Sequence, residues 1–173
     1  MASLLTLTSL LISVALLLVG HGMQLTLLPL RASVIGHTDL QIAIGGSAYF
    51  TGFILGCMVV PRLIARVGHI RSFAVLASAM SSTLLILSMT DNFWLWSGFR
   101  LSTGIFVCGL YTVIESWLND QTTEANRGQV LSIYTFLVLI SMAGGQQIIA
   151  VTEITDTAPF MLLAAIVSVS MIP

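Results

Sequence analysis

The chain has 173 residues, of which 57% are hydrophobic and 8% are charged, and its formal net charge is −1. An average soluble domain carries about 25% charged residues, so a soluble fold of this composition would lack the polar surface that it needs. The composition predicts an integral membrane protein, in which lipid solvates much of the surface. The low net charge and the lack of a basic run argue against nucleic acid as a partner.

Six continuous apolar stretches predict six transmembrane helices, because a helix needs about 20 apolar residues to cross the hydrocarbon. The predicted spans are 4–28, 41–61, 72–89, 94–118, 129–151 and 158–173. The first stretch is longer than the apolar core of a signal peptide, about 7–15 residues, so we expect an uncleaved first helix. The last span holds only about 16 residues before the sequence stops, so we expect it to be truncated and the functional unit to be larger.

The arginines predict the orientation of these spans. Arg62, Arg66 and Arg71 lie between spans 2 and 3, and Arg127 lies between spans 4 and 5, whereas the opposite side holds Arg31 alone. Arginine-rich loops face the cytoplasm. We therefore expect a multi-pass protein of the plasma (inner) membrane with a cytoplasmic N-terminus.

The sequence offers little support for a chemical activity. Cys57 and Cys108 lie in apolar stretches without a CxxC pair, so we expect neither a disulfide framework nor a zinc site. There is no GxxxxGK[ST], GxSxG or HExxH motif, which argues against a nucleotide-driven pump and against a hydrolase. We expect no catalytic residues, no cofactor and no metal.

Three segments carry a family resemblance. They are Arg66-Val67-Gly68-His69-Ile70-Arg71 after span 2, Arg100-Leu101-Ser102-Thr103-Gly104 in span 4, and Glu115 followed by Arg127-Gly128 around the 4–5 connection. These segments resemble the loop signature, the Arg-x-x-x-Gly motif and the Glu…Arg-Gly pattern of the major facilitator superfamily, in particular its YcaD-like branch. The signature departs at Pro61 and Ala65, where the family has glycine and aspartate.

The resemblance implies an all-α membrane fold, namely the N-terminal six-helix half of a twelve-helix transporter, built from inverted three-helix repeats. A C-terminal six-helix half would be its partner. We also expect residues of these motifs at the cytoplasmic end to act as a conformational latch; these are Arg66, Gly68, Arg71, Glu115 and Arg127. We expect Glu115 to lie within about 4 Å of Arg66 or Arg127, as in an ion pair. The alternative is that these charges only set the topology.

Arg100 is the strongest candidate for a binding residue. A charge in the middle of a span costs at least about 2.5–3.5 kcal/mol and usually faces a cavity or a partner. At 1.5 Å per residue, Arg100, His21, Gln24, Tyr49 and Gln146 all lie roughly 6–12 Å below the outer end of their helices. We expect these five residues to bind a small polar or anionic solute, with His21 carrying coupling protons.

Each candidate also has a structural interpretation. Arg100 could bond only to carbonyls, His21 and the two glutamines could bond across helix contacts, and Tyr49 could be ordinary packing. The sequence therefore predicts a secondary, proton-coupled transporter, with a six-helix membrane subunit or scaffold as the alternative. Neither the solute nor the direction of transport can be read from it.

Overall fold

The structure is a computed structural model that describes the backbone of residues 2–171 and the side chains of residues 8–171; the last two residues of the final predicted span lie outside the described residues. Six helices make up the described fold, without a strand: α1 (Ala2–Val34), α2 (Asp39–Val67), α3 (His69–Leu87), α4 (Phe93–Asp120), α5 (Arg127–Ala150) and α6 (Ala158–Val169). The first five are long and apolar enough to cross a membrane, and α6 has 12 residues. The predicted all-α class is confirmed.

Two helices run past the prolines at which the sequence predicted their spans to end. Helix α1 continues beyond Pro29 to Val34, and α2 continues beyond Pro61 to Val67. Each proline removes one backbone donor from its helix, and membrane helices tolerate this loss. A proline near the end of an apolar stretch therefore did not mark the end of the helix here.

Local chemistry sets other helix ends. Thr38 caps α2 through a reciprocal capping box with Gln41, which satisfies backbone donors at the start of that helix. Asn92 accepts hydrogen bonds from the first backbone N–H groups of α4. Gly68 has φ +83°, a conformation that glycine adopts at little cost, and it alone separates α2 from α3.

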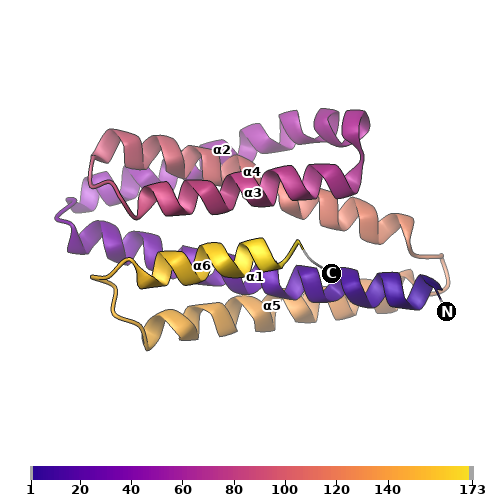
Figure 1. The fold of residues 1–173 in the computed structure, drawn as a ribbon. Coiled ribbons are helices and arrows are strands. Elements are labelled where there is room, and N and C mark those ends of the chain that lie inside the picture. The colour runs from indigo at the N-terminus through magenta and orange to yellow at the C-terminus, as the bar shows by residue number, and fades with distance from the viewer. Residues whose placement is uncertain (1, 172–173) are drawn as a thin grey trace.

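The helices form two groups (Figure 1). In one, α2 packs mainly on α4 and α4 also packs on α3; in the other, α1 packs on α5 and α6. Helices α3 and α6 join the groups. The α1–α2, α3–α4 and α5–α6 loops share one end of the bundle, here called the arginine-poor end. The opposite, arginine-rich end holds Arg62, Arg66, Arg71 and Arg127 near the α2–α3 and α4–α5 connections.

The two largest helix contacts share one geometry. Between α1 and α5, a Cβ added at Gly22 would lie 2.2 Å from the backbone oxygen of Met142, and one added at Gly145 would lie 2.1 Å from that of Val19. Each oxygen belongs to the residue three positions before the opposing glycine. The backbones therefore approach too closely for any side chain at these two positions.

The contact between α2 and α4 repeats this arrangement. An added Cβ would lie 1.9 Å from the oxygen of Leu101 at Gly52, and 2.0 Å from the oxygen of Tyr49 at Gly104. Again, each oxygen lies three positions before the opposing glycine. In a fold of two inverted repeats, α1 and α2 of the first repeat correspond to α4 and α5 of the second, with the opposite orientation. The α1–α5 contact then corresponds to the α2–α4 contact, so their shared geometry fits two inverted three-helix repeats.

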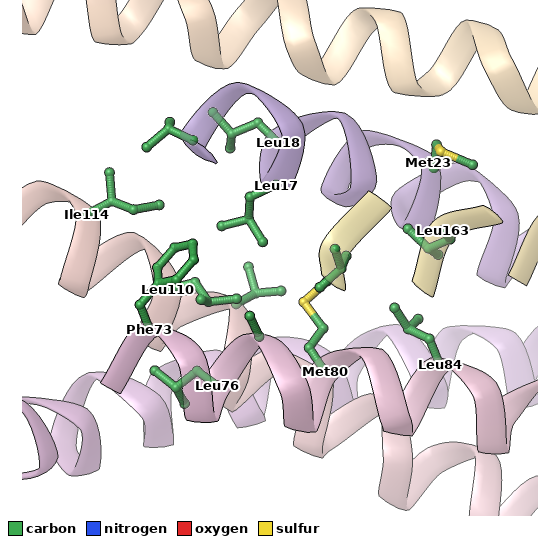
Figure 2. Packing of buried hydrophobic residues seen from close by; sticks show 14 of the residues in the cluster. Leu17, Leu18, Met23, Phe73, Leu76, Met80, Leu84, Leu110, Ile114 and Leu163 are labelled. Carbon is green, nitrogen blue, oxygen red and sulfur yellow. The ribbon is translucent and has the colours of Figure 1, made fainter. Parts of the chain in front are cut away.

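The core lies between α1, α3, α4 and α6. Figure 2 shows Leu17 of α1 pointing toward Leu110 of α4 and Met80 of α3, and all three are nearly inaccessible. In contrast, α2 and α5 expose long apolar faces, including Phe50, Ile54, Met58, Phe136 and Leu139, each more than 60% exposed. Such faces suit lipid or another apolar membrane segment rather than water.

Candidate functional site

Arg100 lies early in α4 and is only 6% exposed. Its guanidinium carbon lies 4.8 Å from the centre of the Tyr49 ring, in a cation–π contact. Its Nη1 atom is buried without a hydrogen-bond partner. Among the described side chains, the one ion pair within 4.0 Å joins His69 and Asp120, so no described carboxylate neutralises Arg100.

A small cavity lies beside Arg100 at the arginine-poor end. Its volume is about 30 Å³, and its lining residues are Leu28, Pro29, Ala32, His37, Gln41, Ile42, Gly45, Gly46, Trp96 and Arg100. A cavity of about 10–15 Å³ is enough for one water molecule. In this conformation the space beside Arg100 admits water or a small ion and is closed to any larger solute.

His21 lies in a second, separate cavity. It is 6% exposed, and its ring meets the Tyr111 ring edge-on at 5.7 Å between centroids. The cavity measures about 10 Å³ and is otherwise lined by apolar side chains of α1, α3 and α4 together with Tyr111. The Nδ1 atom of His21 is buried without a partner.

The predicted site residues are thus divided. The structure brings Arg100 and Tyr49 together, and it places His21 against Tyr111. Gln24 is fully buried, with both amide atoms unpartnered, whereas Gln146 is exposed on α5. Equal depth did not bring the five residues into one cavity, because the face that each residue occupies on its helix also decides what it meets. Their part in binding stays a prediction.

At the arginine-rich end, the contacts differ from the expected latch. Glu115 is exposed and accepts a hydrogen bond from the Tyr134 hydroxyl at 3.2 Å. No ion pair within 4.0 Å joins Glu115 to Arg66 or Arg127 among the described residues, and both arginines are exposed, as is Arg71. The expected ion pair is therefore absent from this conformation, because Tyr134 on α5 lies closer to the carboxylate.

A histidine holds the arginine-rich ends of α3 and α4 together instead. His69 Nε2 lies 2.9 Å from the Ser116 hydroxyl and 3.9 Å from an Asp120 carboxylate oxygen. The placement of the arginines does not point to His69, so this contact was not predicted from the sequence. Gly68, directly before it, provides the turn.

Two residues beside Arg100 were not predicted as part of its site. His37 Nε2 lies 3.1 Å from the Asp91 carbonyl oxygen, and its ring meets that of Trp96 edge-on at 5.8 Å. His37 lies in the connection before α2 and Gln41 lies in the first turn of α2, where a few residues give no helical periodicity that points to their neighbours. Tyr111 shares the helix face of Arg100 at 100° per residue, and it lines the cavity of His21.

The two cysteines are close in space although 51 positions separate them. Their Sγ atoms lie 3.1 Å apart where α2 packs on α4, and both are free thiols. Spacing along the chain could not predict this contact, because the glycine-mediated approach of the two helices creates it.

The helices, the buried arginine and the paired glycine contacts define a multi-pass membrane protein of the kind that forms half of a transporter. The family model described as Major Facilitator Superfamily matches residues 10–172. The chain belongs to the major facilitator superfamily, and the predicted half-facilitator fold is confirmed.

The chain is similar to several curated proteins of this family. An uncharacterized MFS-type transporter of Yersinia pestis (strain Pestoides F) is 29% identical over 150 residues, which cover 86% of this chain and 39% of that protein. One from Yersinia enterocolitica is 30% identical over 152 residues, with the same two shares. The uncharacterized MFS-type transporter YcaD of Escherichia fergusonii is 28% identical over 138 residues, 79% of this chain and 36% of that protein. The chain spans about two fifths of the length of these relatives.

Proposed function

We propose that this chain forms the N-terminal half of a secondary active transporter that moves a small polar or anionic solute across the plasma membrane. Transport would occur by alternating access, with proton coupling. The buried, unpaired Arg100 is the single observation that carries the proposal.

The cost of Arg100 supports a binding role. Burying an ionised group without a partner costs several kcal/mol, so a merely structural residue at this position would be better replaced by an apolar one. Arginine offers a planar set of donors that suits carboxylates and phosphates. An anionic group bound at Nη1 would satisfy both the charge and the free donor.

The small volume beside Arg100 implies a movement before a solute can bind. A space of about 30 Å³ is far smaller than a typical ligand pocket of about 300–1,000 Å³. The cavity is bordered by the arginine-poor ends of α1, α2 and α4. Separation of these ends, facing outward with the N-terminus in the cytoplasm, would open Arg100 to the outside.

His21 is the proposed proton carrier, because imidazole is the side chain that titrates nearest to neutral pH. Its free Nδ1 and its contact with Tyr111 leave one ring nitrogen available to water when the cavity opens. The charged residues of the arginine-rich end remain the proposed latch. Glu115 would then exchange Tyr134 for an arginine in the other access state.

A second candidate function is a six-helix membrane subunit without transport activity of its own. The long exposed apolar faces of α2 and α5 favour it, since they suit docking to another membrane protein as well as to a second transporter half. It gives no account of an unpaired buried arginine.

The test is uptake or efflux of radiolabelled organic anions and zwitterions by the whole protein in proteoliposomes. Arg100→Ala should abolish transport at matched membrane abundance. Arg62→Ala is the matched control, because Arg62 is exposed and its guanidinium bonds only to the Met58 carbonyl of its own helix. Unchanged transport in Arg100→Ala would indicate a structural role for Arg100 and would favour the six-helix membrane subunit without transport activity of its own.

A further inference from the structure

We propose that the cavity beside Arg100 binds a small inorganic monovalent anion, of which chloride is the probe, and that this anion is the counter-ion of Arg100 when no solute is bound. The proposal rests on the proposed function in that it concerns the same arginine. It adds a resident ligand, and it can be tested without measuring transport.

The first reason is the balance of charge. The guanidinium stays protonated in proteins, so Arg100 cannot escape its burial by losing a proton. No carboxylate among the described side chains lies within 4.0 Å of it. The Tyr49 ring covers one side of the group at 4.8 Å but carries no net charge. A counter-ion is therefore missing from the protein itself.

The second reason is the set of donors around the cavity. Arg100 Nη1 is buried and has no partner. The Gln41 side-chain oxygen accepts from the Thr38 backbone nitrogen at 2.9 Å, which leaves the amide nitrogen of Gln41 as the group with hydrogens to donate. The cavity also adjoins the first two turns of α2, where the helix dipole favours negative charge.

The third reason is size. The volume of about 30 Å³ exceeds the roughly 10–15 Å³ that one water needs, so it accepts a halide ion or water but not a larger organic acid. Leu28, Ala32 and Trp96 line the same space with apolar, buried side chains, and such surroundings strengthen the attraction between an anion and the guanidinium. Water alone would occupy the free donor without neutralising the charge.

The test is thermal unfolding of the purified whole protein in chloride, bromide, formate or gluconate at one ionic strength. We expect chloride and bromide to raise the unfolding midpoint by on the order of 2–4 °C relative to gluconate, with a saturable dependence on concentration. Equal midpoints in all four anions would overturn the proposal, because water would then fill the cavity. Stabilisation by formate but not by chloride would also overturn the proposal, since the site would then be selective for a carboxylate group.

Two variants locate the effect. Arg100→Gln should remove the chloride dependence, whereas Arg62→Gln should keep it. If Arg100→Gln does not fold, Gly45→Ala decides, because the added methyl would lie 3.9 Å from Trp96 and 4.0 Å from Arg100, in ordinary contact, and would occupy part of the cavity. Its control is Gly98→Ala on α4, where an added Cβ meets nothing within 4 Å.

The outcomes separate this proposal from the proposed function. A chloride effect that persists in Arg100→Gln or is unchanged in Gly45→Ala would overturn the anion site. If transport depends on Arg100 but the unfolding midpoint does not depend on chloride, the anion site is overturned and the proposed transporter stands. Chloride stabilisation that depends on Arg100, in a protein that transports nothing, would support the anion site and count against the proposed function.

Discussion

The cavity of Arg100 and the cavity of His21 share part of their lining at equivalent positions of α1 and α4, and at one of these positions an arginine stands in place of a leucine. Leu28, Pro29 and Ala32 follow Gly22 in α1 at the same intervals at which Leu110, Tyr111 and Ile114 follow Gly104 in α4. The first trio lines the cavity of Arg100 and the second lines the cavity of His21. Four positions before Gly22 stands Leu18, and four positions before Gly104 stands Arg100.

This difference separates what the backbone does from what the side chains do. The reciprocal glycine contacts build the same helix approach twice, in two equivalent contacts that each join one repeat to the other. Leu18 lines the cavity of His21, whereas Arg100, whose Nη1 has no hydrogen-bond partner, lines the other cavity. The glycine contacts set the packing of the helices, and the side chains that line each cavity set its polarity, so substitutions can disturb either one separately.

The glycine contacts should give the largest effect when disturbed. Gly104→Val and Gly22→Val should each lower the yield of folded protein severely, because a Cβ there would fall 2.0 or 2.2 Å from a backbone oxygen. Overpacking usually costs about 1–3 kcal/mol, and a clash with backbone should exceed that range. Size-exclusion chromatography and thermal unfolding of purified protein measure the loss. Gly144→Val is the control, since an added Cβ there meets nothing within 4 Å; wild-type stability of Gly104→Val would refute the duplicated glycine contacts.

Arg100→Leu makes the charged cavity resemble its apolar counterpart. Transport should be lost while the free energy of unfolding stays the same or rises by about 1–4 kcal/mol, because an unpaired buried charge is replaced by an apolar group. Arg100→Lys keeps the charge without the planar donors and should also impair transport. Paired transport and unfolding measurements check this. A strong loss of stability in Arg100→Leu would instead assign Arg100 to the packing of α4.

His21→Gln tests the apolar cavity. If His21 carries the coupling proton, transport by this variant should persist at a reduced rate and lose its dependence on external pH, because an amide does not titrate. The measurement is the rate of uptake across a series of external pH values. His37→Gln is a useful control, since that imidazole lies beside Arg100 and not in the His21 cavity. An unaltered pH profile in His21→Gln would return this residue to helix packing.

The two ends of the bundle can also be compared by their access to a reagent that cannot cross the membrane. Single cysteines at Asp91 and Glu153, in a background without Cys57 and Cys108, should react with an impermeant maleimide in intact cells. A cysteine at His69 should react only after the cells are opened. All three positions lie at or near loops and none is fully buried, so each variant should fold; the cysteine at His69 loses the contact with Ser116, and the yield of folded protein checks this variant. The opposite labelling pattern would invert the proposed orientation.

The sequence predicted the class of the fold because apolar length and arginine placement are properties of single segments. Long uncharged stretches require helices in lipid, whatever their neighbours are. The Arg66–Arg71 and Arg100–Gly104 segments pointed to the family that the comparison then confirmed. The ends of α1 and α2 were less predictable, because membrane helices tolerate the prolines that end helices in water.

Partners across helices were decided by the tertiary structure alone. The depth of a residue follows from its position along one helix, but its contacts depend on how that helix is rotated against the others. For this reason His21 and Arg100 share a depth and lie in different cavities, and Glu115 meets Tyr134 rather than an arginine. The sequence by itself determined that an arginine is buried in the membrane. Only the packing of α2 on α4 decided that Tyr49 covers this arginine and that a small cavity lies beside it.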